Sequence, residues 1–279
     1  MNPSMSVSVQ QRATKPLTIV HDWTASGHAS IDLASWIGEL PEGGARFASR
    51  SIPANELHAE ALTLAARDAF LGAIGELPSG PCRVWSFLPR PTECDTDSLE
   101  RYMRFNAGRT DAYRMLADRV RVVPAGTCVG HAGGDLVVHA LWLDEPFSAV
   151  ENPRQRPAWL YSKRYGPVPP AFTRAVRSGS LLLASGTAAV VGESSMHPGS
   201  LDAQFDESVR NLEALAEAGG GTGRWRSLQI YVRDAADLPR VRELAADRFG
   251  LEAERILHAL ICRRELLVEI EGICDVAKP

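Results

Sequence analysis

The chain has 279 residues, of which 45% are hydrophobic and 23% charged, a composition typical of globular proteins with a hydrophobic core. Its formal net charge of −4 offers no basic surface for nucleic acid, and no apolar run reaches the ~18 residues of a membrane span. The five cysteines form no CxxC pair and no metal-ligand spacing with histidine. We therefore expect a cytoplasmic protein with no nucleic-acid partner, no membrane partner and no metal.

Two helices are predicted in the first half of the chain. Alanine, leucine and phenylalanine recur at helical spacing over residues 55–74, and the Pro78-Ser-Gly80 turn ends that pattern. A longer amphipathic pattern covers residues 97–120. Gly108 lies inside this pattern, and because glycine weakens a helix interior we expect a kink or an interruption there.

Short apolar strands are predicted next to these helices, at residues 83–88 and 136–143. The stretch that follows, residues 144–157, is rich in proline and charge and is interpreted as a linker. This linker divides the chain into an N-terminal domain, residues 1–150, and a C-terminal domain, residues 151–279.

The second half alternates strands with helices more regularly. Its predicted elements are a strand at 181–185, a helix at 202–218 that the glycine run 219–223 ends, a strand at 227–233, a helix at 237–249 before Gly250, and two tail strands. The order β-α-β-α-β-β predicts an α+β fold in which helices pack on one face of a mixed sheet.

The tail carries a pattern that suggests acid chemistry. Residues 255–262 and 265–274 are predicted to be two strands joined by a two-residue turn at Arg263-Arg264. In the second strand Glu269 and Glu271 share one face, about 7 Å apart. Two interpretations remain open. Either this face is exposed to solvent, or desolvation and the neighbouring charge raise the pKa of one carboxyl and make it a general acid.

Two more residues are candidates to assist such an acid. If the turn has two residues, His258 lies opposite Glu269 across the strands and could orient it, although a single histidine in an apolar strand is more often a core residue. Upstream, the strand at 181–185 is predicted to break at Ser185-Gly186. Glycine there serves either a positive φ or the close approach of a substrate.

Four segments, in this order along the chain, together resemble the chorismatase family. They are Tyr102-Met-Arg-Phe-Asn-Ala-Gly-Arg109, Ala184 to Gly192, Met196 to Asn211, and Cys262 to Gly272. The tail by itself is similar to the C-terminal signature of the YjgF/RidA fold. The resemblance implies two YjgF/RidA-like domains with the active site in the C-terminal one. It also implies an enzyme that removes the enolpyruvyl group of its substrate, chorismate, as pyruvate.

The resemblance assigns roles to individual residues. It places the proton donor at Glu269, since breaking an enol ether requires a proton on the methylene carbon. It places substrate-gripping side chains at Tyr161 and Arg174, and a carboxylate-binding arginine at Arg255. Because chorismate carries two carboxylates, which arginine binds bidentately, Arg109 is a third candidate. For each arginine the alternative is a surface ion pair.

Cys262 occupies the position that sorts members of the family by product. In the resemblance, a small apolar residue accompanies hydrolysis to a dihydroxycyclohexadienoate, whereas cysteine accompanies 3-hydroxybenzoate. Cys262 would then act as a shape or proton-handling element and not as a nucleophile, with Gly186 in the substrate-binding wall. This chemistry requires no cofactor.

Several alternatives to this function remain open. The same fold and substrate could give 4-hydroxybenzoate or the diene, and a generalist YjgF-like enamine/imine deaminase or a metabolite-binding protein would share the fold. Single-domain YjgF proteins form trimers, and two such domains in one chain could satisfy part of that surface internally. We therefore expect either a monomer or a homotrimer.

Overall fold

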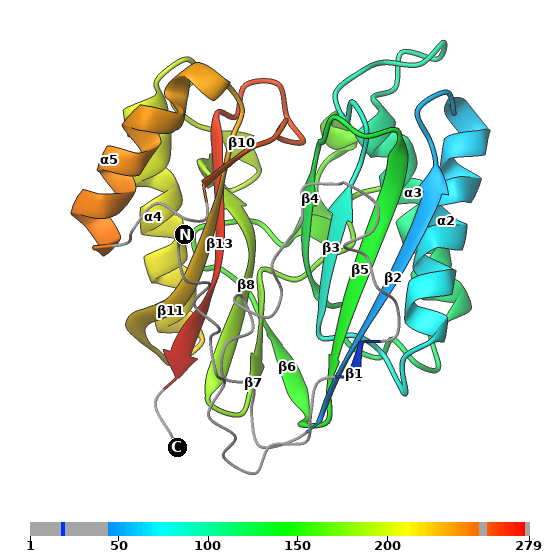
Figure 1. The fold of residues 1–279 in the computed structure, drawn as a ribbon, viewed down its shortest axis with the longest axis horizontal. Helices are drawn as coiled ribbons and strands as arrows, with labels where there is room; N and C mark the ends of the chain where they lie inside the picture. Colours follow the sequence, from blue (N-terminus) through cyan, green and yellow to red (C-terminus); the bar gives the residue numbers. More distant parts are fainter. Residues whose placement is uncertain (1–17, 20–43, 251–255, 277–279) are drawn as a thin grey trace, which may run out of the picture.

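The computed structural model describes residues 18–19, 44–250 and 256–276. These residues form two large mixed β-sheets that face each other, with helices on the outer face of each sheet (Figure 1). The predicted α+β class, with helices packed on one face of each mixed sheet, is confirmed.

The N-terminal sheet is built from short buried strands. Its elements in chain order are β1 (Thr18–Ile19), β2 (Ala45–Pro53), α2 (Ala59–Gly75), β3 (Arg83–Phe87), α3 (Arg101–Met115), β4 (Ala125–Val129) and β5 (Asp135–Leu143). The strand order is β1-β2-β5-β3-β4, in which β5 is antiparallel to β2 and β3, and β4 is parallel to β3. The helix predicted at 55–74 and both predicted strands are confirmed to within a few residues, whereas β2 and β4 were not predicted.

Gly108 lies inside an uninterrupted helix. α3 is shorter than the predicted 97–120, and it continues through this glycine without a break. A Cβ at Gly108 would lie 2.2 Å from the Thr63 carbonyl oxygen and 2.8 Å from the Cβ of Ala66, both on α2. The predicted kink is therefore wrong, because the glycine serves the close packing of α3 on α2.

The C-terminal sheet contains the elements of the second half. In chain order these are β6 (Phe147–Val150), η2 (Ala158–Leu160), η3 (Lys163–Tyr165), β7 (Ala175–Ser178), β8 (Leu181–Ala188), β9 (Val190–Val191), β10 (Ser194–Ser195), α4 (Leu201–Ala218), β11 (Gly221–Val232), η4 (Ala235–Asp237), α5 (Leu238–Phe249), β12 (Ile256–His258) and β13 (Val268–Val276). The strand order is β12-β11-β13-β8-β7-β6, and β9 and β10 form a small separate pair. Both predicted helices are confirmed, and α5 ends at Gly250 with a left-handed φ of 63°.

Two segments of the second half differ from their predicted structure. The predicted linker at 144–157 contains β6, which pairs with β7 in the C-terminal sheet. The glycine run ends α4 at Ala218 as predicted, but β11 already begins at Gly221 and so extends beyond the predicted strand at 227–233. The domain boundary at residue 150 stays a prediction.

The tail does not form the predicted hairpin. β12 is parallel to β11, whereas β13 lies between β11 and β8 and is antiparallel to both. The connection from β12 to β13 reaches across to the N-terminal sheet, where Ile261 forms a β-bridge with Val129. His258 is exposed and pairs with Val232, so its predicted place opposite Glu269 is wrong.

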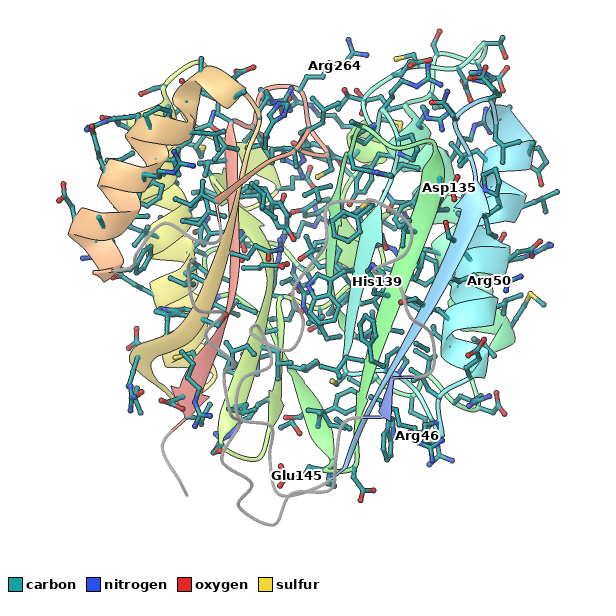
Figure 2. The ribbon with its side chains drawn as sticks, in the orientation of Figure 1. Arg46, Arg50, Asp135, His139, Glu145 and Arg264 are labelled. Atoms are coloured by element: carbon teal, nitrogen blue, oxygen red, sulfur yellow. The ribbon has the colours of Figure 1, made fainter. Side chains whose placement is uncertain are left out.

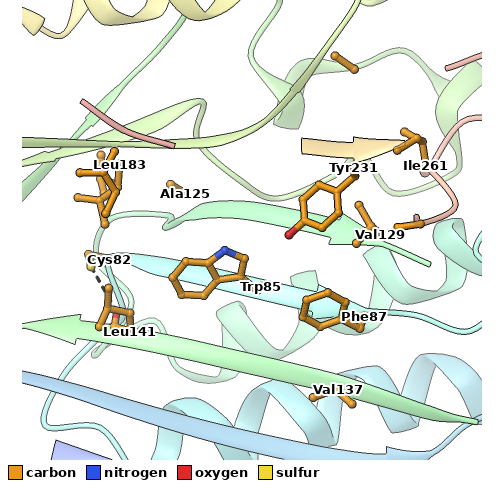
Figure 3. Close-up of a cluster of buried hydrophobic side chains, with 14 of the residues drawn as sticks. Cys82, Trp85, Phe87, Ala125, Val129, Val137, Leu141, Leu183, Tyr231 and Ile261 are labelled. Atoms are coloured by element: carbon orange, nitrogen blue, oxygen red, sulfur yellow. Dashed lines mark hydrogen bonds between the residues drawn. The ribbon is translucent and has the colours of Figure 1, made fainter. Parts of the chain in front are cut away.

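Buried apolar side chains fill three layers. One cluster separates α2 and α3 from the N-terminal sheet, and another separates α4 and α5 from the C-terminal sheet. A third lies between the two sheets, where Trp85 and Phe87 of β3 approach Tyr231 of β11 (Figure 3). Because each sheet is covered on both faces, any polar side chain on an inner face lies in a dry environment and needs polar partners.

Candidate active site

The two tail carboxyls lie on the inner face of the C-terminal sheet. Only 5% of Glu269 and 0% of Glu271 are exposed, so the solvent-exposed interpretation of this face is wrong. In the β11–β13 ladder Glu269 pairs with Tyr231 and Glu271 pairs with Gln229, which turns both carboxyls toward the N-terminal sheet. The two carboxyls are therefore neighbours in a buried layer, where a charge on one strongly affects the pKa of the other.

Glu271 is surrounded by hydrogen-bond donors from both sheets. Its Oε2 atom lies 2.5 Å from Nη2 of Arg83, in an ion pair whose side chains are both fully buried. Its Oε1 atom accepts from Trp85 Nε1 at 3.1 Å, from the Tyr231 hydroxyl at 3.0 Å and from Gln229 Nε2 at 3.2 Å. Donors on every side stabilise a carboxylate anion, so Glu271 is the charged member of the pair.

Glu269 has a different environment. Within the described part of the chain its carboxyl makes none of the hydrogen bonds or ion pairs that surround Glu271. Burial, followed by the charge of Glu271, raises the pKa of Glu269 to about 8, although Arg83, Arg174 and Arg263 oppose the rise. A carboxyl with this pKa holds its proton at neutral pH, which is the requirement for a general acid.

Gly186 lies directly against the Glu269 carboxyl. A Cβ at residue 186 would be 1.9 Å from Oε1 of Glu269 and 2.8 Å from its Cδ. The predicted break of the strand at this glycine is wrong, since β8 continues to Ala188, with an irregularity in its register opposite Ile270 and Gly272 of β13. Of the two roles considered for this glycine, close approach applies, and the group that approaches is the Glu269 carboxyl; the place of Gly186 in the substrate-binding wall stays a prediction.

A pocket with an empty volume of about 590 Å³ opens beside Glu269, Gly186 and Cys262. Aromatic rings form much of its wall, namely Tyr102, Tyr161, Tyr165 and Phe172. Glu100 and Tyr102 come from the start of α3, so the N-terminal half contributes to the wall as well. Acidic, basic and aromatic side chains therefore meet in one pocket, as is usual for a small-molecule site.

Arg174 is a buried cation in the pocket wall with a fixed orientation. Its Nη2 atom donates to the Tyr161 hydroxyl at 2.5 Å and to the Arg156 carbonyl oxygen at 3.0 Å. Its guanidinium carbon lies 5.2 Å from the ring centre of Phe172. Among the described residues its buried Nε has no acceptor. A buried guanidinium with an unused N–H is suited to an anionic ligand.

Arg109, a predicted substrate-binding arginine, does not line the pocket formed by the described residues. Arg109 on α3 is buried and donates to Asn106 Oδ1 at 2.7 Å. It lies against Phe172, at 5.7 Å from the ring centre, and is absent from the wall formed by the described residues. Arg255 lies outside the described residues. A substrate-binding role for either residue stays a prediction.

Cys262 lines the pocket together with Glu269. Burial, followed by the charge of Glu269, raises the pKa of its thiol to about 12. The sulfur is therefore a neutral thiol at neutral pH and a poor nucleophile. This is consistent with the expected role in shape or proton handling, which stays a prediction.

Arg263 is a pocket residue that the sequence pattern did not identify. Its guanidinium carbon lies 3.9 Å from the ring centre of Tyr165 and 5.2 Å from that of Tyr161, and its Nη1 donates to the Glu193 carbonyl oxygen at 2.8 Å. The pattern indicated only a hairpin turn at this position. The available signal for Arg263 was its position next to Cys262, which was itself a predicted site residue.

Glu100 is a second acidic residue of the wall that was not predicted. Burial raises the pKa of Glu100, and its Oε1 atom lies 3.3 Å from Nε of Arg264. Arg264 comes from the β12–β13 connection and also donates to the Thr92 carbonyl oxygen, so it joins the two halves at one end of the molecule (Figure 2). The amphipathic pattern of α3 gave no reason to single out its first residues.

The described residues contain no cluster of histidine, cysteine and acidic side chains that could hold a metal ion. None of their helices is long and apolar enough to cross a membrane.

Comparisons with known proteins show similarity over most of the chain. The model of the FkbO/Hyg5-like chorismatase N-terminal domain matches residues 23–142. A 3-hydroxybenzoate synthase from Streptomyces hygroscopicus is 29% identical, over 97% of this chain and 85% of its own length. A chorismatase from Streptomyces rapamycinicus is 32% identical, over 85% of this chain and 73% of its own.

A solved structure extends the likeness to three dimensions. The crystal structure of a chorismatase, 29% identical in sequence, matches 82% of this chain and 74% of its own length with a TM-score of 0.70. Sequence identity of 32% over most of both chains, together with the shared fold, shows that this chain belongs to the chorismatase family.

Proposed function

We propose that the protein cleaves the enolpyruvyl ether of chorismate and releases pyruvate and 3-hydroxybenzoate, with Glu269 as the general acid. The observation that carries this proposal is the unlike pair of carboxyls, a protonated Glu269 facing a pocket and an ionised Glu271 behind it. The relatives named 3-hydroxybenzoate synthase and chorismatase support the choice of substrate and product.

The pocket wall suits a small aromatic precursor with two carboxylates. Arg174 and Arg263 supply the cations for those carboxylates, and Tyr161 holds Arg174 in place through the hydrogen bond at 2.5 Å. The aromatic rings of the wall pack against the faces of the substrate ring. Arg109 and Arg255 are further candidates for a carboxylate contact.

The reaction starts when the Glu269 carboxyl transfers its proton to the methylene carbon of the enol ether. Positive charge then develops on the ether carbon, and the bond between the ether oxygen and the ring breaks as pyruvate leaves. The neighbouring ring hydroxyl attacks the ring carbon that pyruvate leaves and forms a strained cyclic ether, and its proton passes to the Glu269 carboxylate. The carboxyl returns this proton to the ether oxygen as the intermediate opens, and it takes up the proton that the ring carbon loses to give 3-hydroxybenzoate. The atoms of chorismate are divided between the two products, and no water is consumed.

Glu271 also favours the return of the acid to its starting state. After the proton transfer, Glu269 is an anion beside the Glu271 carboxylate, in a buried layer where like charges repel strongly. This repulsion makes Glu269 a good acceptor for the proton that the ring loses. The same carboxyl can therefore serve as acid in the first step and as base in the last.

Cys262 is proposed to direct the reaction to the hydroxybenzoate and not to the hydrolysed diene. Removing the thiol in Cys262→Ala opens space beside Glu269 for a water molecule. We expect the variant to form more of the diene, measured by chromatography of the reaction mixture. Cys274→Ala is the matched control, because Cys274 is buried in the outer cluster beneath α4. An unchanged product ratio in Cys262→Ala would remove this role.

The test of the proposed function is to mix the purified protein with chorismate and to measure pyruvate release and product identity. We expect pyruvate and 3-hydroxybenzoate in equal amounts. Release of 4-hydroxybenzoate or of the diene together with pyruvate would support a chorismatase but would show that its product is not 3-hydroxybenzoate. No pyruvate from folded protein would overturn the proposal, and turnover of an imine substrate instead would favour the generalist deaminase.

A further inference from the structure

Thr127, on the edge strand β4, uses every hydrogen-bonding position of its hydroxyl group. Its oxygen accepts from the Gly186 backbone N–H at 2.9 Å and from Nη2 of Arg83, and its hydrogen is donated to Oε2 of Glu271. A hydroxyl has one donor and two acceptor positions, so these three partners leave none unused. The side chain is 3% exposed, and its orientation is fixed by these protein groups.

A second contact ties the same two strands together one residue earlier. The Gly126 backbone N–H donates to Ser185 Oγ at 2.8 Å, and Ser185 Oγ donates to the Thr173 carbonyl oxygen at 2.5 Å. Two successive residues of β4 are thus bonded to two successive residues of β8, across the boundary between the sheets. The backbone of Gly186, on which the Glu269 carboxyl rests, is held in place from the N-terminal sheet.

Several titratable or charged groups face Glu269 from the elements around it. They are Glu271 on the same strand, Arg83 on β3, Cys128 on β4, Tyr102 on α3, Arg174 next to β7, and Cys262 and Arg263 on the β12–β13 connection. Among them the charge of Glu271 raises the pKa of Glu269, whereas the arginines lower it. Arg83 and Glu271 therefore act on Glu269 with opposite signs although they form one ion pair.

We infer that Arg83, Thr127 and Glu271 form a positioning element for the acid, through which the N-terminal sheet fixes the strand beneath Glu269 and sets the charge beside it. The inference rests on the proposed function, because it concerns the same carboxyl. None of the three residues lines the pocket in the described part of the protein, so they act through Gly186 and Glu269 and not on the substrate.

Two variants, each replacing a charged side chain by a neutral one, test the electrostatic part of the inference. They are expected to shift the pH at which kcat falls in opposite directions. Glu271→Gln removes the like charge and leaves Arg83 uncompensated, so the alkaline fall of kcat moves to lower pH by about one unit or more. Arg83→Met removes the opposing charge, so the fall moves to higher pH. A purely structural role would lower kcat at every pH and leave the position of the fall unchanged in both variants, which would overturn the inference.

Variants of Thr127 test the positioning part without leaving a buried charge unpaired. Thr127→Val removes the hydroxyl with little change of shape, and we expect kcat to fall roughly tenfold or more while KM changes less than about twofold. Thr127→Ser restores the hydroxyl and should restore most of kcat. Thr63→Val is the matched control, a buried threonine of α2 that does not line the pocket. Wild-type kcat in Thr127→Val would contradict the positioning role.

The two proposals fail in distinguishable ways. Absence of pyruvate release by the wild type would overturn the proposed function alone. In that case NMR titration with isotope-labelled glutamate tests the inference directly, because the carboxyl resonance that disappears in Glu269→Gln identifies the acid. Its titration midpoint should move to lower pH in Glu271→Gln and to higher pH in Arg83→Met. Midpoints that do not move, or move in the same direction, would overturn the inference.

Discussion

Glu269 and Glu271 are two residues apart on one strand, yet their surroundings give them opposite protonation states. Five donors reach the Glu271 carboxylate, from Arg83, Trp85, Thr127, Gln229 and Tyr231. Glu269 lies instead against the Cα of a glycine and beside an apolar and aromatic pocket wall. The difference between the two carboxyls arises from their partners and not from the strand itself.

The pH dependence of turnover follows from this difference. A general acid is active only while it holds its proton, and the pKa of Glu269 is raised from 4.5 to about 8. We therefore expect kcat to be constant at pH values well below 8 and to fall to half of that value at a pH of about 8, measured at saturating chorismate. A kcat that instead rises with pH between about 6 and about 9 would show that the ionised carboxyl is the active form.

The site residues that the sequence could identify lie in segments that resemble the chorismatase family. Glu269, Cys262, Tyr161, Arg174 and Gly186 were all predicted as site residues, and the structure brings them together around one pocket. The partners of Glu271 were not predicted, because they come from other strands, between 40 and 188 residues earlier in the chain. No local pattern in a sequence records which distant donor reaches a given carboxylate.

At the scale of elements, the two helices of the second half and their ends were predicted well because their signals are local. α4 ends at the glycine run and α5 ends at Gly250, where a left-handed residue is required. The predicted pairing of the two tail strands was wrong, because a strand in a hairpin and a strand that pairs elsewhere show the same apolar alternation. β12 pairs with β11, and the chain then crosses to the N-terminal sheet before β13 begins.

The packing of β8 against β13 gives a prediction at this scale. Gly186→Ala places a methyl group where the Glu269 carboxyl now lies, so the carboxyl must move and kcat should fall at least tenfold. Gly75→Ala is the matched control, since a Cβ there meets nothing within 4 Å at the end of α2. Wild-type kcat in Gly186→Ala would show that the carboxyl does not depend on this close approach.

At the scale of the whole molecule, the two sheets are joined by a continuous buried layer. Trp85 and Phe87 of the N-terminal sheet and Leu183 and Tyr231 of the C-terminal sheet belong to one cluster (Figure 3). The sequence predicted two halves of the same fold class but could not show which faces meet. Strands that are apolar on both sides, such as β3 and β8, carry no alternation that would mark an inner face.

This shared layer predicts that the two halves unfold together. Trp85→Ala removes a large side chain from the layer and also a donor to Glu271, so we expect the free energy of unfolding to fall by about 3–5 kcal/mol. Urea unfolding followed by far-UV circular dichroism should show one transition at a lower midpoint. A second transition, with part of the chain unaffected, would show that the halves are independent.

The central claim is that the protonated Glu269 carboxyl drives the release of pyruvate from chorismate. Glu269→Gln keeps the shape of the side chain but cannot donate a carboxyl proton, and Glu265→Gln, an exposed glutamate four residues earlier, is the matched control. The measurement is the rate of pyruvate release by both variants and the wild type. We predict a loss of at least about a hundredfold in Glu269→Gln and a wild-type rate in Glu265→Gln. A folded Glu269→Gln protein that releases pyruvate at the wild-type rate would contradict the claim.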